Sequence, residues 1–356
     1  MTALVVRAER IIILKPCCIG DVVFTTPLLT ALRRAYPVAQ IDWAVGSMAI
    51  AALRGHPAIN TLIDTGPLAN PAARPGSMLR LVRTLRRGRY DLAVVPDRSR
   101  LLGLAVLQAL IPNRAGLDSG GRGFAYTIRA VIDPVTIRHE AEIYLDVGRA
   151  LGLDVSDCWA NVPPTADSLT AADAILREHG IPGERLIVVH PGGGVNAGMT
   201  MLLKRWPPER FAGLAARAAD ALGNGAQIAV IGLESDRDSV EAFRAALGRP
   251  VIDLTSRLSL PVTAALAARA ALYIGNDNGV AHLAAAAGAR VLMIFGPSDP
   301  RRYAPFVPPD HARFAWRPVK LPAGGVVAGA PPGFDWAQHG VTVDEAWEQA
   351  RPLLKV

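Results

Sequence analysis

The stretch Ile11-Ile12-Ile13-Leu14-Lys15-Pro16-Cys17-Cys18-Ile19-Gly20-Asp21 decides the fold at the start of the chain. Its leading apolar residues indicate a buried strand, and the residues from Val22 to Ala35 have the spacing of a helix. A strand, a short loop and a helix in this order form the first part of a βαβ unit, whose strands are parallel. The chain therefore begins like a parallel sheet that is wrapped by helices.

The same alternation continues to Leu151. The expected strands are Gln40 to Val45, Ile59 to Ile63 and Asp91 to Val95, and the expected helices are Met78 to Arg87, Ser99 to Leu110 and His139 to Leu151. The segment from Asn113 to Gly123 contains glycine and arginine and is predicted to be a loop. The first part of the chain is therefore expected to be one doubly wound α/β domain.

A polar, proline-bearing segment, Asn161-Val162-Pro163-Pro164-Thr165, interrupts the pattern and is typical of a linker. A second series of strands and helices follows, from a helix near Thr170 to a strand ending at Phe295, then a Pro- and Gly-rich tail from Pro318 to Gly340. We predict one domain at residues 1–165, a second at 166–340 and a C-terminal helix at 341–356. In two such domains the ligand crevice is expected beyond the carboxyl ends of the strands, in a central cleft.

Composition and charge limit the class of protein. Apolar residues make up 51% of 356 residues, which is enough for two ordinary cores. The most apolar stretch, Leu101 to Ile111, is about half of a membrane span. Charged residues interrupt the first ten residues, so we expect no signal peptide and a cytoplasmic location. The net charge of +7 favours anionic partners, and arginine, which supplies most of it, suits phosphate and carboxylate.

The cysteines and histidines do not suggest a metal site or a disulfide framework. The chain has 3 cysteines, of which Cys17 and Cys18 are adjacent. Neighbouring cysteines bond each other only with strain, so we expect both to be reduced. No CxxC or HExxH spacing is present, so we expect no metal.

The first loop carries an acid at the start of the first helix. It contains one glycine, Gly20, where a dinucleotide-binding protein has GxGxxG, so a nicotinamide or flavin enzyme is disfavoured. Asp21 follows, and an acid at this position is in most proteins a helix cap. From the residues alone, a cap and a catalytic carboxylate both stay open.

Two loops of the second series have features of a phosphate site. The first, His190-Pro191-Gly192-Gly193-Gly194, precedes the basic pair Lys204-Arg205, and glycine N–H groups can face an anion. The second, Gly275-Asn276-Asp277-Asn278-Gly279, leads into a small-residue helix that contains His282. An ordinary glycine turn, a cap at Asp277 and a structural histidine are the alternatives.

Three segments in this order resemble the signature segments of glycosyltransferase family 9, whose best-known members are the heptosyltransferases of lipopolysaccharide core assembly. They are Ile19 to Leu29, Lys204 to Phe211, and Gly275 to Gly279 with Phe295-Gly296-Pro297-Ser298-Asp299-Pro300. The resemblance implies a GT-B fold, in which two Rossmann-like domains face a central cleft. It also implies an acceptor-binding N-terminal domain and a C-terminal domain that binds the nucleotide sugar.

The resemblance further implies an inverting glycosyltransferase with roles for particular residues. Asp21 would be the general base, and Lys204 would neutralise the diphosphate leaving group, without a metal or other cofactor. The substrate-binding residues would be Gly20, Gly192, Gly193, Glu234, Asp277, Asn278, Gly279 and His282. Glu234 would accept hydrogen bonds from the ribose, and the segment from Leu254 to Leu258 would lie by the base.

The implied donor is ADP-heptose, and the implied acceptor is a lipopolysaccharide core or related cell-envelope glycolipid, with no nucleic acid as partner. Arg98 and Arg122, from an arginine cluster that includes Arg100, Arg114 and Arg129, are expected to bind the acceptor, although a solvated face is the alternative. Peripheral contact with the cytoplasmic face of the inner membrane is also expected. The other functions considered are a GT-B sugar-nucleotide epimerase and a non-catalytic nucleotide- or glycan-binding relative.

The sequence also departs from the family pattern. Cys17 and Cys18 stand where many members have serines, and Asn278 stands where a threonine is common. The stretch from Val195 to Leu203 is longer than in the core heptosyltransferases. These departures bear on the donor and the acceptor rather than on the fold and the reaction class.

Overall fold

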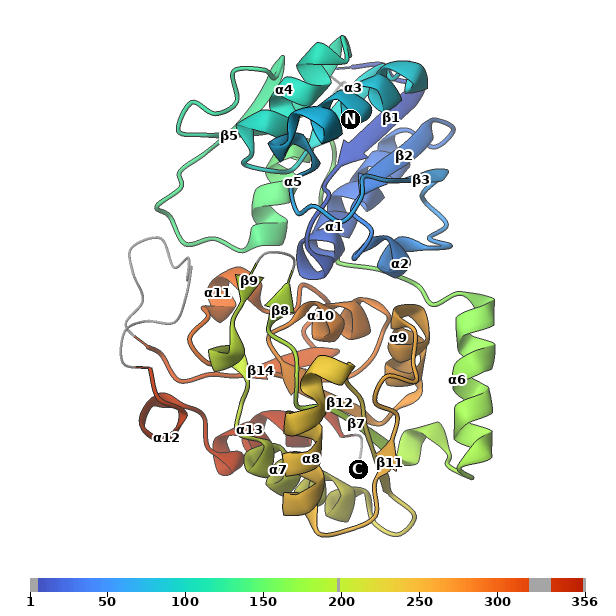
Figure 1. The fold of residues 1–356 in the computed structure, drawn as a ribbon, viewed down its shortest axis with the longest axis vertical. Coiled ribbons are helices and arrows are strands. Elements are labelled where there is room, and N and C mark those ends of the chain that lie inside the picture. The colour runs from blue at the N-terminus through green and yellow to red at the C-terminus, as the bar shows by residue number, and fades with distance from the viewer. Residues whose placement is uncertain (1–5, 197–198, 320–333, 355–356) are drawn as a thin grey trace. The chain divides into compact units, whose positions relative to one another are not determined.

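The computed structural model describes residues 6–196, 199–319 and 334–354. The chain divides into two units, Met1–Ala160 and Asn161–Val356. Each unit is built on a six-stranded parallel sheet with helices around it (Figure 1). The predicted doubly wound α/β architecture is therefore confirmed. The Pro- and Gly-rich tail predicted from Pro318 lies for the most part outside the described residues.

In the first unit the strands lie in the order β3-β2-β1-β4-β5-β6. The strands are β1 Arg10–Leu14, β2 Gln40–Val45, β3 Thr61–Asp64, β4 Leu92–Val95, β5 Asn113–Ser119 and β6 Ile128–Ile132. The helices are α1 Ile19–Ala35, α2 Ile50–Leu53, α3 Pro75–Gly88, α4 Arg100–Gln108 and α5 Glu140–Ala150, with a 3₁₀ turn at Pro71–Ala73. Strand β1 comes first in the sequence but lies in the middle of the sheet. The loop that follows it therefore lies near the middle of the sheet edge.

The core of the first unit follows from the alternation of β1. Ile12 and Leu14 pack with apolar residues of α3 and α4, including Leu85 and Val106. Side chains next to them along a strand point to the opposite face, so Ile11 and Ile13 lie on the other side of the sheet. All four apolar residues of β1 are fully buried.

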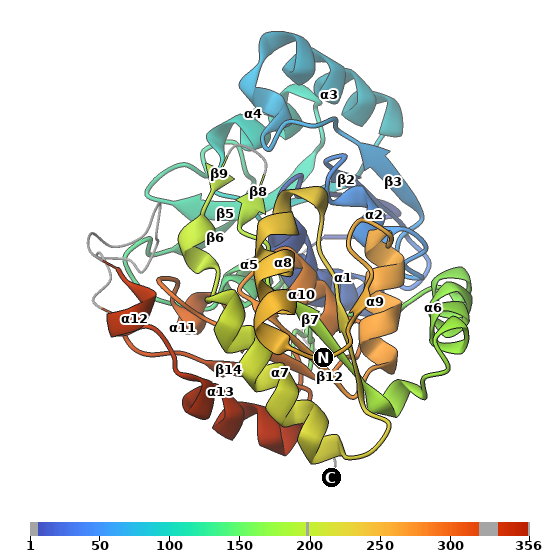
Figure 2. The same ribbon diagram turned by 60° about the horizontal axis from the view of Figure 1, so that its bottom comes forward.

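The second unit repeats this arrangement, with the strand order β11-β10-β7-β12-β13-β14. Its strands are β7 Leu186–His190, β10 Gln227–Val230, β11 Ile252–Asp253, β12 Leu272–Asn276, β13 Val291–Ile294 and β14 Ala312–Ala315, and β8 Val195–Asn196 pairs antiparallel with β9 Met199–Thr200. Its helices are α6 Ala166–Glu178, α7 Pro208–Leu222, α8 Arg237–Leu247, α9 Leu260–Arg269, α10 Gly279–Ala286, α11 Pro300–Tyr303, α12 Trp336–His339 and α13 Val343–Ala350. Figure 2 shows α7 and α8 side by side.

The core of the second unit includes the C-terminal helix. Trp206 and Phe243 are completely buried in a cluster that also contains Trp347 of α13. Trp206 donates from its indole N–H to the carbonyl of Val341 at 2.8 Å. The predicted C-terminal helix thus packs into the second unit rather than standing apart. In the described part of the chain, no helix combines the length and apolarity needed to cross a bilayer.

The prediction of a loop from Asn113 to Gly123 is wrong, because most of this segment forms the strand β5. Its polar side chains have local partners that make burial acceptable: Asp118 accepts from the N–H of Gly123 at 3.0 Å, and Arg114 donates to the carbonyl of Ala125 at 2.7 Å. The ring of Tyr126 lies against Gly116, where a side chain would collide with it. Strands β6 and β14 were not predicted.

The buried ring of Phe243 gives a test of the second core. We expect Phe243→Ala to lower the free energy of unfolding by about 3–5 kcal/mol, because the truncation leaves a cavity. Urea denaturation measures this change. Phe314→Ala is the matched control, since Phe314 is 40% exposed and should cost much less. Equal losses for the two variants would contradict the described core.

Candidate functional site

The first group of site residues surrounds Asp21 in the first unit. Asp21 lies in the first turn of α1, where its carboxylate accepts from the N–H of Cys18 at 3.3 Å. The hydroxyl of Tyr144, on α5, donates to the other carboxylate oxygen at 2.5 Å. Asp21 therefore caps its own helix, as the simpler interpretation expected, yet its side chain remains 37% exposed.

Lys15 and Tyr144 determine the electrostatics around this carboxylate. The Nζ atom of Lys15 lies 3.0 Å from Asp97 and 3.9 Å from Asp21, and 4.6 Å from the centre of the Tyr144 ring. Burial alone would lower the pKa of Lys15, but the charges of Asp97 and Asp21 raise it. Burial raises the pKa of Tyr144 well above its ordinary value, and Asp21 adds to the rise. The phenol of Tyr144 therefore donates to Asp21, while the ammonium of Lys15 is a nearby positive charge whose hydrogen bond goes to Asp97.

Cys17 and Cys18 do not fit the prediction of reduced thiols. The structure joins them in a disulfide across adjacent positions. The peptide bond between the two residues is cis, and their Cα atoms lie 3.1 Å apart. The remaining cysteine, Cys158, is free and buried.

The arginines predicted to bind the acceptor differ in their surroundings. Arg98 makes a two-bonded ion pair with Glu140, at 2.8 and 3.2 Å. Arg122 is exposed in the segment between β5 and β6. Gly20 lies in the first turn of α1, next to Asp21. The binding roles of all three remain predictions.

In the second unit, the carboxylate of Asp236 holds the glycine loop that follows β7. One oxygen accepts from the N–H of Gly193 at 2.9 Å and from Arg205 at 2.7 Å. The other accepts from the N–H of Leu233 at 3.0 Å and lies 3.4 Å from the ring of His190. Burial alone would raise the pKa of Asp236, but these bonds hold it well below its usual range. These contacts favour the ionised form of Asp236, and this carboxylate fixes the loop.

Lys204 and Arg205, the predicted basic pair, contact different groups and have different roles. Arg205 donates to Asp236 and to the carbonyl of Gly193 at 2.8 Å, so it supports the glycine loop from behind. Gly192 lies so close to Asp236 that a side chain there would collide with it. Gly193 has a φ of +96°, a conformation that glycine adopts readily. The loop is thus built for close backbone packing, and Arg205 is not available as a second free cation.

Lys204 forms a buried cluster with residues that follow β12 and β13. Its Nζ atom donates to Asp277 at 2.5 Å, and the hydroxyl of Ser298 donates to the same oxygen at 2.6 Å. The ring of His282 lies 3.4 Å from the other oxygen of Asp277. Burial alone would raise the pKa of Asp277, but the charge of Lys204 and the contact with His282 hold it well below its usual range. The structure thus brings three predicted site residues together.

Asn278 is the N-cap residue of α10, and its side-chain amide is only partly satisfied by the described residues. Its Oδ1 atom accepts from the N–H groups of Val280 and Ala281, each at 3.0 Å. Its Nδ2 atom is buried, and within the described residues no acceptor lies in reach of it. A side chain at Gly193 would meet this amide nitrogen. A donor at the start of a helix, beside a glycine loop, is an arrangement that suits an anion.

The remaining predicted residues lie nearby at the same sheet edge. Gly279 is the first residue of α10. Glu234 follows β10 and pairs with Arg237, and both side chains are exposed. The segment predicted to lie by the nucleotide base follows β11, with Leu254 buried. The binding roles of Gly279, Glu234 and this segment stay predictions.

Sequence reasoning did not assign roles to several residues that build the site. Asn276 donates to the carbonyls of Pro191 and Gly192, at 3.1 and 3.0 Å, and accepts from the N–H of Trp206 at 2.8 Å. Asp236, Ser298 and Tyr144 were also missed. Ser298 and Asn276 belong to the quoted segments, so a signal existed for them, whereas Tyr144 sits in an ordinary helical pattern.

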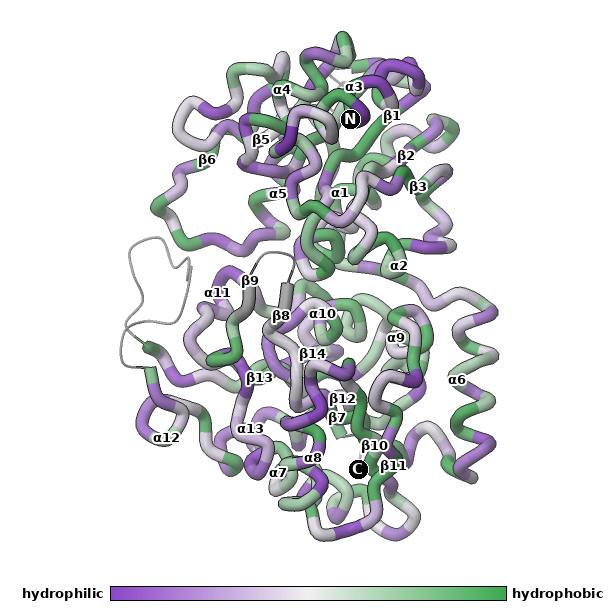
Figure 3. The backbone as a smooth tube through the Cα atoms, in the orientation of Figure 1, coloured by the Kyte–Doolittle hydropathy of each residue, from purple (hydrophilic) through white to green (hydrophobic). Residues whose placement is uncertain are grey.

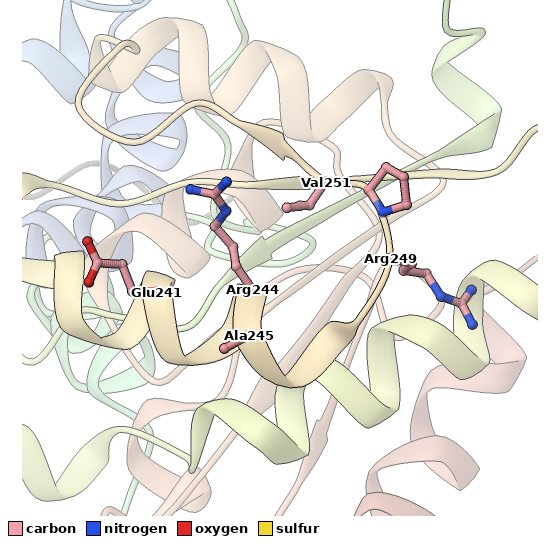
Figure 4. A pocket seen from close by; sticks show the side chains of 6 residues that line it. Glu241, Arg244, Ala245, Arg249 and Val251 are labelled. Atoms are coloured by element: carbon pink, nitrogen blue, oxygen red, sulfur yellow. The ribbon is translucent and has the colours of Figure 1, made fainter.

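Among the described residues, no group of three or more His, Cys, Asp or Glu side chains gathers in a way that could hold a metal ion. A shallow hollow is lined by residues of α8 and by Arg249, Pro250 and Val251 (Figure 4). Because Val251 directly precedes β11, this hollow lies at the opposite edge of the sheet from the polar loops.

Comparison with known proteins gives a consistent result. Residues 78–314 match glycosyltransferase family 9 (heptosyltransferase). The chain is 25% identical over 302 residues to lipopolysaccharide heptosyltransferase 3 of Escherichia coli K12, covering 79% of this chain and 80% of the relative.

Two solved structures share the fold. A family 9 glycosyltransferase from Veillonella parvula has a TM-score of 0.78 at 22% identity, covering 97% of both chains. The ADP-heptose lps heptosyltransferase II of E. coli has a TM-score of 0.72 at 24% identity, covering 97% of this chain and 98% of that one. The chain has the GT-B fold and belongs to glycosyltransferase family 9, so it is a glycosyltransferase.

Proposed function

We propose that this protein is an inverting heptosyltransferase that moves a heptose from ADP-heptose to a lipopolysaccharide core or a related cell-envelope glycan. Family membership supports the reaction class, and the names of the relatives support the donor and the acceptor. The first unit would bind the acceptor and the second unit the nucleotide sugar. The reaction would take place in the cytoplasm, and it would need no cofactor.

The observation that carries the proposal is the exposure of the Asp21 carboxylate. Three carboxylates lie near the end of β1 and β4, and a general base needs an oxygen that a substrate hydroxyl can reach. Glu140 is only 4% exposed and bound to Arg98, and Asp97 is bound to Lys15 and to the N–H of Ser99. Asp21 is more exposed than either, at 37% against 22% for Asp97. It is therefore the candidate base.

The cluster around Lys204 is proposed to hold the diphosphate. An ammonium has three N–H donors, and Asp277 takes one of them, which orients the others. The N-terminus of α10 and the free Nδ2 donor of Asn278 add further donors nearby. Negative charge grows on the diphosphate as it leaves, so fixed donors of this kind stabilise the transition state more than the bound donor.

The proposed reaction is a single displacement at the anomeric carbon of the donor sugar. The acceptor hydroxyl gives its proton to Asp21, and its oxygen forms a bond to the anomeric carbon. The bond from that carbon to the diphosphate oxygen breaks, the configuration inverts, and ADP leaves with the bonding electrons. The carboxylate needs to take the proton only late in this step, when the hydroxyl has become acidic.

An assay with ADP-heptose separates this proposal from its alternatives. ADP release that depends on an added lipopolysaccharide-core acceptor supports transfer. A donor that is isomerised without acceptor indicates an epimerase, and donor binding without turnover indicates a non-catalytic protein. Either of the last two results would overturn the proposal.

We expect Asp21→Asn to lower kcat by about 10²–10⁴, because the base is lost. Asparagine can still accept the N–H of Cys18, so the fold should persist. The dissociation constant for ADP-heptose should not change, which calorimetry would measure. Asp133→Asn, at an exposed acid of the same unit, is the matched control. Normal turnover in Asp21→Asn would assign the base elsewhere.

We expect Lys204→Gln to weaken ADP-heptose binding and to lower kcat, each by about tenfold to a hundredfold, because a charged hydrogen bond is removed. The change also leaves Asp277 buried without its cation, so the double variant Lys204→Gln/Asp277→Asn is needed to separate binding from stability. Arg217→Gln, which breaks an exposed ion pair with Asp344, is the control. Unchanged kinetics in both Lys204 variants would remove Lys204 from the mechanism.

A further inference from the structure

The two oxygens of the Asp21 carboxylate have unequal surroundings. The Oδ1 atom accepts from the hydroxyl of Tyr144 at 2.5 Å and lies 3.9 Å from the Nζ atom of Lys15. Within the described residues, the Oδ2 atom has one hydrogen bond, from the N–H of Cys18 at 3.3 Å, which is long for a bond of this kind. An ionised carboxylate can accept about four hydrogen bonds. Oδ2 is therefore the oxygen with more capacity left for a substrate hydroxyl.

The phenol of Tyr144 is a fixed point from which this carboxylate is held. Tyr144 is only 1% exposed, and the helix that contains it, α5, packs against α1. Figure 3 shows the mostly apolar α1 next to α5. Close packing holds a buried ring in one rotamer, whereas the partly exposed side chain of Asp21 is less confined by its neighbours. The bond from Tyr144 therefore sets the direction in which the carboxylate points.

Lys15 supports the same arrangement through its charge. Its Nζ atom donates to Asp97 at 3.0 Å, and Asp97 in turn accepts from the N–H of Ser99 at 2.8 Å. These bonds hold the ammonium beside Oδ1 of Asp21 and 4.6 Å from the centre of the Tyr144 ring. A cation next to one carboxylate oxygen disfavours a proton on that oxygen. Protonation of Asp21 is thus directed to Oδ2.

Tyr144 is not suited to act as an acid or a base itself. Burial raises the pKa of its phenol well above the ordinary value, and the charges of Asp21 and Glu140 add to the rise. The charge of Arg98 acts in the opposite direction, but Arg98 is paired with Glu140 at 2.8 Å. The phenol therefore keeps its proton and serves only as a donor to Asp21.

We propose that Tyr144 is the positioning residue of the general base, which engages Oδ1 of Asp21 and so presents Oδ2 to the acceptor hydroxyl. The proton of that hydroxyl goes to Oδ2, while Oδ1 keeps its bond from Tyr144 before and after the transfer. Orientation matters here, because misplacing a catalytic group by about 1 Å can cost on the order of a hundredfold in rate. The inference rests on the proposed function, since it requires Asp21 to take the proton.

The first test measures the kinetics of the full chain with ADP-heptose and a lipopolysaccharide-core acceptor. We expect Tyr144→Phe to lower kcat by about tenfold to a hundredfold, because the ring stays in place but a hydrogen bond to a charged group is lost. The dissociation constant for ADP-heptose, whose proposed site is in the second unit, should not change. Normal turnover in Tyr144→Phe would overturn the inference.

Tyr90→Phe is the matched control. Tyr90 is also buried in the first unit, and its hydroxyl donates to the carboxylate of Asp42 at 2.9 Å. Asp42 lies within β2, opposite Ile12 of β1, and not in a loop at the sheet edge. The control thus removes the same kind of buried bond away from Asp21, and it should keep its kcat. A loss of kcat equal to that of Tyr144→Phe would mean a general effect on stability and would overturn the assignment.

A double variant shows whether Tyr144 acts through Asp21. We expect Asp21→Asn/Tyr144→Phe to match the kcat of Asp21→Asn within about twofold, because a positioning residue has no effect once the base is gone. A further tenfold loss would overturn the inference. Normal turnover in Asp21→Asn would overturn the proposed base and this inference together. Lost turnover in Asp21→Asn beside normal turnover in Tyr144→Phe would overturn this inference alone.

Nuclear magnetic resonance gives a readout that needs no sugar nucleotide. In a chain whose aspartates are isotope-labelled at the carboxyl carbon, the signal of Asp21 is the one that disappears in Asp21→Asn. We expect this signal to move in Tyr144→Phe, where its donor is lost, and to stay in place in Tyr90→Phe, where the signal of Asp42 should move instead. An Asp21 signal that stays in place in Tyr144→Phe would overturn the inference, whether or not the chain transfers heptose.

Discussion

Parallel strand pairing is the constraint from which the site follows. When every strand of a sheet runs in the same direction, every loop after a strand lies at the same edge. In the second unit this places the glycine loop after β7, the Asp277 turn after β12 and Ser298 after β13 next to one another. Residues that are far apart in the sequence, such as Lys204 and Asp277, thereby come into contact.

The two units use buried charge in different ways. In the second unit Asp236 and Asp277 are both buried and fully engaged, so they organise the backbone and the lysine rather than exchange protons. In the first unit the buried acids are also engaged, but Asp21 keeps part of its carboxylate open. An acid meant to move a proton must remain accessible, whereas one meant to hold a loop gains from burial.

The fold could be predicted from the sequence because its central strands are uniformly apolar. The pattern failed at β5, where the polar side chains of Arg114 and Asp118 are satisfied by hydrogen bonds to the loop that follows the strand, which hydrophobic periodicity does not reveal. The disulfide between Cys17 and Cys18 was missed because adjacent cysteines are expected to bond each other only with strain. The hydrogen bond from Tyr144 to Asp21 spans 123 positions, and a single sequence carries no signal for such a pairing.

The packing of Gly193 against Asn278 links the glycine loop to the N-cap residue of α10. Any side chain at position 193 would push the amide aside, and with it the cap of the helix. A threonine at position 278, which is shorter, would instead leave room beside the loop. The size of residue 278 therefore sets the space beside the loop, whereas position 193 stays restricted to glycine by its φ of +96°.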